Sequence, residues 1–199
     1  MKKVAILFIV LLTSSFVFAQ NTYVPDDKFE QALIDLGYDT TLDDYVLTAN
    51  ISGVTHLDVQ NKEIADLTGI EDFVALIELW CSYNLLTSLD VSASTALTLL
   101  MCNNNQLTSL DVSSNTALIT LWCQDNQLTY LNMRNGITDA LNGIGPEDTD
   151  FNATNNSNLT CIETLDPTYA TANWTSANGN IDAGVTFTYI CGVDVDGVS

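Results

Sequence analysis

The sequence predicts a solenoid, a β-rich, right-handed coil whose short repeats stack and align their strands into a parallel, concave sheet. Three segments of 21 residues, 76–96, 97–117 and 118–138, align without a gap. Apolar residues recur at matching places in these segments: Leu76/Leu97/Leu118, Leu79/Leu100/Leu121, Leu86/Leu107/Leu128 and Leu89/Leu110/Leu131. A unit of this size cannot bury its own apolar face, so neighbouring units must stack and share one core.

Residues 1–19 have the features of a secretory signal peptide. A basic head, Met1-Lys2-Lys3, precedes the apolar run 4–12, and small residues stand before a cut after Ala19. The run is shorter than the roughly 20 residues of a membrane span, and no cysteine follows the cut, as a lipoprotein would require. We therefore expect an exported protein, secreted or at the cell surface, without a membrane span after cleavage.

The chain beyond the signal peptide is strongly acidic. Lys28, Lys62 and Arg134 are its only basic residues, against 25 aspartates and glutamates. A field of this sign repels phosphate backbones and anionic lipid surfaces. Nucleic-acid binding is therefore excluded.

Residues 20–53 are expected to form an N-terminal cap that covers the first coil. An apolar face that starts at Phe29 indicates a helix, and Gly37 ends it. Asp27 and Glu30 have the spacing of a capping box, with Asp in place of the usual Ser or Thr.

Residues 54–162 hold the repeats, about five coils. In each coil, Leu79-x-Cys81 or its equivalent alternates with period two, which predicts a short strand with one buried face. Leu57 has the same relative place 22 residues upstream of Leu79. Residues 135–150 break the period, and we expect an irregular coil that bulges there as a loop.

Two further ladders follow the repeat, Cys81/Cys102/Cys123 and Asn84/Asn105/Asn126. Aligned thiolates would suggest a metal or redox centre, but zinc favours four ligands and the single histidine, His56, is in an earlier coil. We interpret the cysteines as small buried hydrophobes. The asparagines are expected to bond the backbone of their own and the next coil at a bend, where strand partners are lost.

Acidic side chains offer calcium as an alternative that the sequence leaves open. Asp90, Asp111 and Asn132 stack at the 21-residue step, where they could hold an ion between coils, although such residues more often accept backbone hydrogen bonds in a turn. Other acids gather without completing a known calcium loop: Asp35, Asp39, Asp43, Asp44, Asp194 and Asp196. We predict no metal site and no cofactor.

A row of large side chains is expected on the concave face, because residues between the inward Leu and Cys of each strand point outward. The row consists of Trp80, Met101 and Trp122, with flanking residues Glu78, Ser82, Asn103 and Gln124. Exposed apolar patches of this kind tend to be binding sites, although drift at variable positions would give the same pattern. No Ser–His–Asp or Cys–His arrangement supports catalysis. The sequence thus favours a non-catalytic module that binds a protein or glycan; the alternative is a structural or adaptor scaffold of a larger cell-surface protein.

The pattern L-x-x-L-x-C-x-x-N-x-L, which starts at Leu76, resembles the leucine-rich repeat of secreted bacterial, internalin-like proteins. The resemblance covers about residues 22–191, and Lys62 departs from it where asparagine is expected. It implies a leucine-rich-repeat solenoid with a helical N-terminal cap and a disulfide-closed C-terminal cap.

The C-terminal cap is placed at residues 163–191, followed by a tail at 192–199. Five cysteines in an exported protein suggest pairing. We predict Cys161–Cys191 as the only disulfide, because side chains that run parallel into the core have poor geometry for a bridge. The protein is expected to be a monomer.

Overall fold

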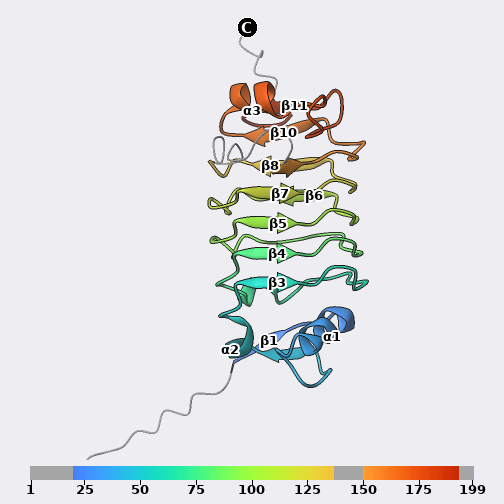
Figure 1. The fold of residues 1–199 in the computed structure, drawn as a ribbon, viewed down its shortest axis with the longest axis vertical. Helices are drawn as coiled ribbons and strands as arrows, with labels where there is room; N and C mark the ends of the chain where they lie inside the picture. The colour runs from blue at the N-terminus through green and yellow to red at the C-terminus, as the bar shows by residue number, and fades with distance from the viewer. Residues whose placement is uncertain (1–19, 137–149, 193–199) are drawn as a thin grey trace, which may run out of the picture.

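A computed structural model of the chain describes residues 20–136 and 150–192. The predicted signal peptide and most of the predicted irregular loop at 135–150 lie outside these residues, as does residue 193 onward. The described part is a stack of coils with a small cap at its N-terminal end (Figure 1).

The N-terminal cap combines a short antiparallel ribbon with two helices. Strand β1 (Asn21–Tyr23) pairs with β2 (Tyr45–Leu47), and the helices are α1 (Asp27–Asp35) and α2 (Thr48–Ile51). The sequence indicated Asp27 as the N-cap of α1, but the N-cap is Asp26. Oδ1 of Asp26 accepts hydrogen bonds from the amides of Lys28 (2.9 Å) and Phe29 (3.0 Å). Glu30 is four residues after this N-cap and therefore does not form the predicted capping box.

Within the described residues, five parallel strands run along one side of the stack, and we call them the front sheet. They are β3 (His56–Asp58), β4 (Glu78–Trp80), β5 (Leu99–Met101), β7 (Thr120–Trp122) and β9 (Phe151–Asn152). Leu57, Leu79, Leu100 and Leu121 pair in register, so the 21- and 22-residue steps of the sequence become the rungs of the sheet. The predicted parallel-sheet solenoid is confirmed.

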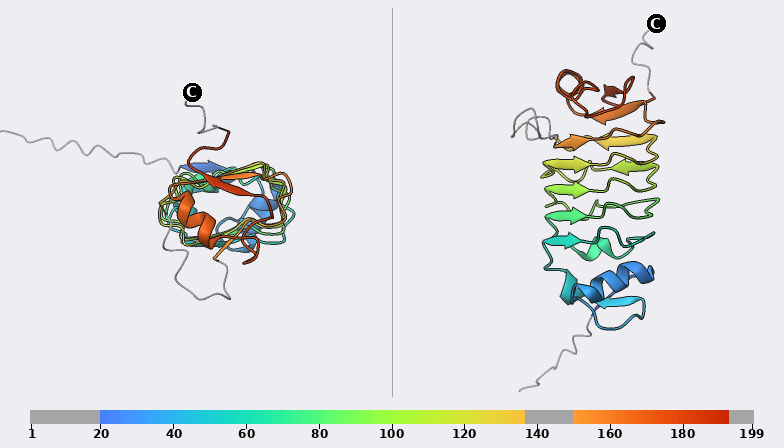
Figure 2. Two further views of the ribbon diagram at one scale, coloured as in Figure 1. Left: turned by 90° about the horizontal axis from the view of Figure 1, so that it is seen from above. Right: turned by 45° about the vertical axis from the view of Figure 1, so that its right-hand side comes forward.

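A second parallel sheet, which the sequence analysis did not predict, covers the opposite side (Figure 2). This back sheet consists of β6 (Ser109–Asp111), β8 (Tyr130–Met133), β10 (Cys161–Thr164) and β11 (Thr186–Thr188). Its signal is present in the chain, because Leu110 and Val112 alternate with period two and are both buried. Seen along the stack, the coils form a flattened ring around the core (Figure 2).

The asparagine ladder joins consecutive coils. The Nδ2 of Asn105 donates to the carbonyls of Cys81 (3.0 Å) and Cys102 (3.1 Å), and its Oδ1 accepts from the amide of Leu86 (3.0 Å). Asn84, Asn126 and Asn156 repeat this pattern. Each amide therefore serves its own coil and the preceding one, not the next one as expected.

A left-handed residue stands directly before each ladder asparagine and before Lys62, which has the equivalent place in the first coil. The φ angles are positive at Asn61, Tyr83, Asn104, Asp125 and Asn155, each between 55° and 58°. This conformation turns the chain sharply at the end of the front strand. Asn and Asp tolerate it better than other side chains do.

The aspartates considered for calcium make turns. Oδ1 of Asp90 accepts from the amide of Ser92 (2.9 Å) and Oδ1 of Asp111 from that of Ser113 (2.8 Å). Hydrogen bonds from the side chain and backbone of Ser92 lower the pKa of Asp90. Burial raises the pKa of Asp111, but bonds from Ser113 and Asn132 outweigh it and the pKa is lowered.

The C-terminal end is closed by a helix and a disulfide. Helix α3 (Pro167–Asn173) contacts β10 and β11, and Trp174 after it packs against Phe151 and Phe187, at centroid distances of 4.9 and 5.8 Å. A bond joins Cys161 to Cys191. A single 3₁₀ turn, η1 (Ile70–Asp72), is the other helical segment of the described coils.

Candidate binding surface

The strand register places the predicted large side chains in one column on the outer face of the front sheet. Trp80 pairs with Met101, and Met101 pairs with Trp122. The column begins at Asp58 and continues to Asn152. Because adjacent strands lie roughly 4.8 Å apart, the two tryptophans are separated by about 10 Å.

The column is half-buried rather than fully exposed. The three large side chains flank inward leucines that have 0% exposure, Leu79, Leu100 and Leu121. The indole nitrogen of Trp80 is covered and has no hydrogen-bond partner in the part of the chain that the structure describes. This ring therefore lies against the surface of the sheet and presents mainly its apolar body.

A polar pair stands at the N-terminal side of the column. The ring of His56 meets that of Trp80 edge to face at 5.2 Å between centroids. His56 Nδ1 lies 2.9 Å from Oε2 of Glu78, and both side chains are exposed. Glu78 is thus accessible, as predicted, and is already engaged by His56.

Two of the predicted flanking residues are not accessible. Ser82 is 1% exposed and Asn103 is 5% exposed, and the hydroxyl of Ser82 donates to Oδ1 of Asn103 at 2.5 Å. The expectation that they point out to the surface is wrong, because the chain turns inward immediately after Cys81 and Cys102. Gln124, which has the equivalent place in the next coil, is half-buried.

One residue of the column was not named from the sequence. Asn152 pairs with Trp122. It follows that residue by 30 positions instead of 21, so the regular period did not indicate it. The usable signal was Phe151, which matches the inward leucines and is buried. The residue after it therefore had to face outward.

The cysteine ladder lies behind this face, inside the core. Cys81, Cys102 and Cys123 are free and have 0% exposure. Burial raises the pKa of Cys102 to about 12, and burial together with Cys102 raises the pKa of the other two well above the ordinary value. The thiols are therefore protonated at neutral pH, as the interpretation as core hydrophobes requires.

The described residues contain no helix that is long and apolar enough to cross a membrane.

Comparisons with known proteins identify similar repeats in Listeria. Internalin J of Listeria monocytogenes serotype 4b (strain F2365) is 36% identical over 75 residues, which are 38% of this chain and 8% of that protein. The solved functional domain of InlJ from Listeria monocytogenes, described as including a cysteine ladder, has a TM-score of 0.52 and 25% identity, over 78% of this chain and 42% of that one. The solved internalin inlF of strain 4b F2365 gives 0.49 and 20%, over 71% and 44%. No family model matches, and the chain spans less than half of each of these proteins.

Proposed function

Because the chain is an internalin-like leucine-rich-repeat solenoid, we propose that it is a non-catalytic recognition module that binds a partner along the outer face of its front sheet. The observation that carries this proposal is the register of Trp80, Met101 and Trp122 on three adjacent strands. Aromatic and thioether side chains provide large contact areas at small entropic cost.

The spacing of the column favours an elongated ligand. Two indoles about 10 Å apart can stack against alternate sugar rings of a glycan or against side chains of an extended peptide. A small metabolite would not reach both. The repeats of this chain are similar to those of internalin J. The kind of ligand is inferred here from the surface of this chain alone.

The charge of the chain adds a preference within that class. The net charge is −20, and Asp58 and Glu78 lie at one end of the column. We expect neutral or cationic partners to be favoured, and binding of cationic partners to weaken as salt rises.

We also propose that the protein acts outside the cytoplasm, as a monomer. The Cys161–Cys191 disulfide supports export, since such bonds persist in oxidising compartments. N-terminal sequencing of protein recovered from the medium or cell envelope tests this, and a start at Gln20 is expected. Light scattering tests the oligomeric state.

The binding proposal is tested with the Trp80→Ala/Trp122→Ala variant on arrays of neutral oligosaccharides and of unstructured basic peptides. Binding that the unmodified protein shows should fall at least tenfold, about 1.4 kcal/mol. The matched control is Tyr130→Ala, which truncates a half-buried aromatic residue on the back sheet. It should bind as the unmodified protein does.

The outcomes distinguish recognition from the scaffold alternative. Retention of binding by a correctly folded double variant would place the site elsewhere. Absence of any saturable ligand on either array, with a folded protein, would favour a structural or adaptor role. Circular dichroism accompanies each measurement, because the tryptophans are half-buried and their removal exposes part of the sheet.

A further inference from the structure

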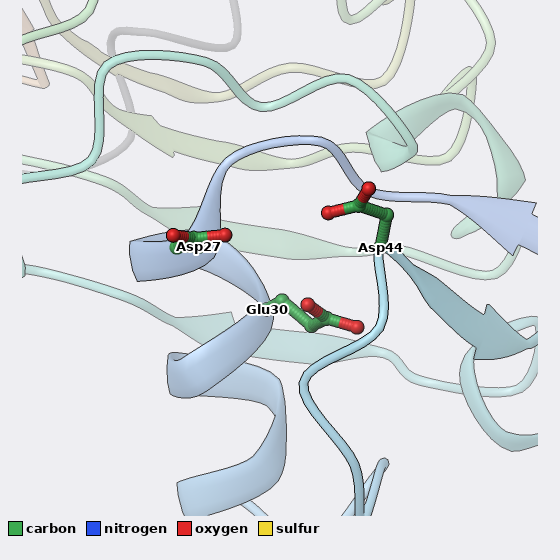
Figure 3. A group of neighbouring side chains, drawn as sticks. All are labelled: Asp27, Glu30 and Asp44. Carbon is green, nitrogen blue, oxygen red and sulfur yellow. The ribbon is translucent and has the colours of Figure 1, made fainter.

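The N-terminal cap contains three carboxylates that converge from segments distant in sequence. Asp27 and Glu30 come from the first turn of α1, and Asp44 comes from the loop before β2 (Figure 3). One carboxylate oxygen of each lies within 4.8 Å of the others. Calcium binds oxygen ligands at about 2.3–2.6 Å, so ligands on opposite sides of one ion are about 5 Å apart. The three groups are therefore close enough to share a single ion.

Backbone hydrogen bonds position Glu30 and the loop that carries Asp44. Glu30 Oε1 accepts hydrogen bonds from the amides of Asp43 (2.9 Å) and Tyr45 (3.1 Å). The carbonyl of Asp44 accepts from the amide of Val24 at 2.8 Å, and Asp44 itself has a φ of 67°. The loop is thus bonded both to the helix and to Val24, the residue after β1, and the Asp44 side chain points toward the helix (Figure 3).

The second oxygen of Glu30 is the observation that points to a ligand. The residue has 0% exposure, and Oε2 is buried without a hydrogen-bond partner among the residues that the structure describes. A buried polar atom that lacks a hydrogen bond is costly, so an oxygen in this position favours a ligand that would satisfy it. Lys28, the basic residue of α1, lies instead 3.6 Å from Glu63. The helix dipole favours acids in a first turn, but it does not explain why one of them is buried with an oxygen left bare.

We propose that Glu30, Asp27 and Asp44 form a binding site for one divalent cation of the calcium type. Glu30 supplies the inner ligand through Oε2, while the exposed Asp27 and Asp44 close the site from the solvent side and water completes the coordination. A bound ion joins α1 to the loop before β2 and stiffens the cap. With three protein carboxylates, the dissociation constant belongs to the weak class of extracellular sites, roughly 0.1–1 mM.

The test uses the whole protein, stripped with a chelator and then titrated with calcium chloride at constant ionic strength. Constant ionic strength matters because a chain of net charge −20 is stabilised unspecifically by any added salt. Saturable binding by calorimetry is expected, together with a rise of the melting temperature by about 3 °C or more at 10 mM calcium. Terbium is a second probe, since Tyr45 adjoins Asp44 and should sensitise its emission.

Three variants decide the location. Asp44→Asn retains a residue that tolerates the left-handed backbone, and Glu30→Gln retains the oxygen that accepts the two amides. Both should keep or raise the melting temperature without calcium and lose most of the calcium response. Asp35→Asn, the control, removes the same charge from an exposed position on α1 and should retain the full response. No saturable calcium effect, or equal loss in Asp44→Asn and Asp35→Asn, would overturn the proposal. Should Glu30→Gln fail to fold, Asp44→Asn still decides it.

Discussion

At the scale of single residues, both the nitrogen and the oxygen of each ladder asparagine's side-chain amide form hydrogen bonds. The side chain of Asn105 has three carbonyl acceptors and one amide donor, all from the backbone of two coils. Its 8% exposure means that water cannot replace these partners freely. Removal of the amide therefore leaves buried backbone groups unsatisfied, which costs more than the bond itself contributes.

Asn105→Ala should lower the free energy of unfolding by roughly 1–3 kcal/mol in denaturant titrations. Gln106→Ala, an exposed neighbour, is the control and should stay within about 0.5 kcal/mol of the unmodified protein. Asn104 is unsuitable as the control, although it is also outside the ladder, because its φ of 55° is one that alanine adopts poorly. Equal losses in the 105 and 106 variants would contradict the assigned register.

The turn aspartates predict a pH effect. The folded pKa of Asp90 is lowered from 3.8, so its carboxylate stabilises the fold above that pH and the contribution disappears as pH falls through the lowered value. Asp90→Asn keeps the turn-forming oxygen and loses the charge. The unmodified protein should be more stable than this variant at pH 6, and the difference should shrink below pH 3.8 in urea titrations. A difference that is constant down to pH 2 would mean that the charge contributes nothing.

At the scale of elements, the two classes of cysteine occupy opposite environments. The ladder thiols lie in the core behind the front sheet, where burial raises their pKa values. The Cys161–Cys191 bond instead joins β10 to the residues that follow β11. The bond spans 30 residues, and on the chain-entropy model a closed loop of this size stabilises the fold by about 3–4 kcal/mol. The C-terminal coil therefore depends on it more than the central coils do.

Iodoacetamide should label no cysteine in the native protein and Cys81, Cys102 and Cys123 after unfolding without reductant. Mass spectrometry reads the result, and a labelled Cys161 or a bridge within the ladder would contradict it. Reduction before unfolding should first expose the segment around α3 to hydrogen exchange. Fastest exchange in the central coils instead would show that the disulfide does not determine the stability of this end.

The regular period of the repeats was informative about the front sheet but did not lead to the back sheet. Equal spacing of Leu79, Leu100 and Leu121 was enough to predict the front sheet and the outward column. The burial of Ser82 and Asn103 was not predictable from alternation, because a left-handed residue follows each of them and ends the extended strand. Tyr83 gives no sign of that conformation, whereas Asn104 is of a type that tolerates it. The group of Asp27, Glu30 and Asp44 was not predicted, because Asp27 and Glu30 were assigned to a capping box and their approach to Asp44 depends on the loop that Glu30 binds.

At the scale of the whole molecule, contacts between neighbouring coils stabilise the fold, and repulsion between negative charges along the whole stack opposes it. Each coil contacts its neighbours along the stack (Figure 1), so stability is approximately a sum of local interfaces. Against this, a net charge of −20 opposes compaction throughout.

Raising sodium chloride from about 20 to about 500 mM should therefore raise the melting temperature, because screening reduces this repulsion. Differential scanning calorimetry in a calcium-free buffer measures the shift. Potassium chloride is the control and should act alike. A fall of the melting temperature would mean that the few ion pairs, such as Lys62–Asp35 at 3.5 Å, outweigh the general repulsion.

The front sheet keeps its register where the sequence between two of its strands is longer. Phe151 pairs directly beside Leu121 although 30 residues separate them, whereas the preceding steps are 21 residues. Closing a longer loop costs only about 0.6 kcal/mol for each doubling of its length. Sequence can therefore be gained or exchanged between β8 and β9 in evolution while the front sheet keeps its pairing. In engineering, a foreign peptide inserted into this connection should likewise leave Phe151 paired with Leu121.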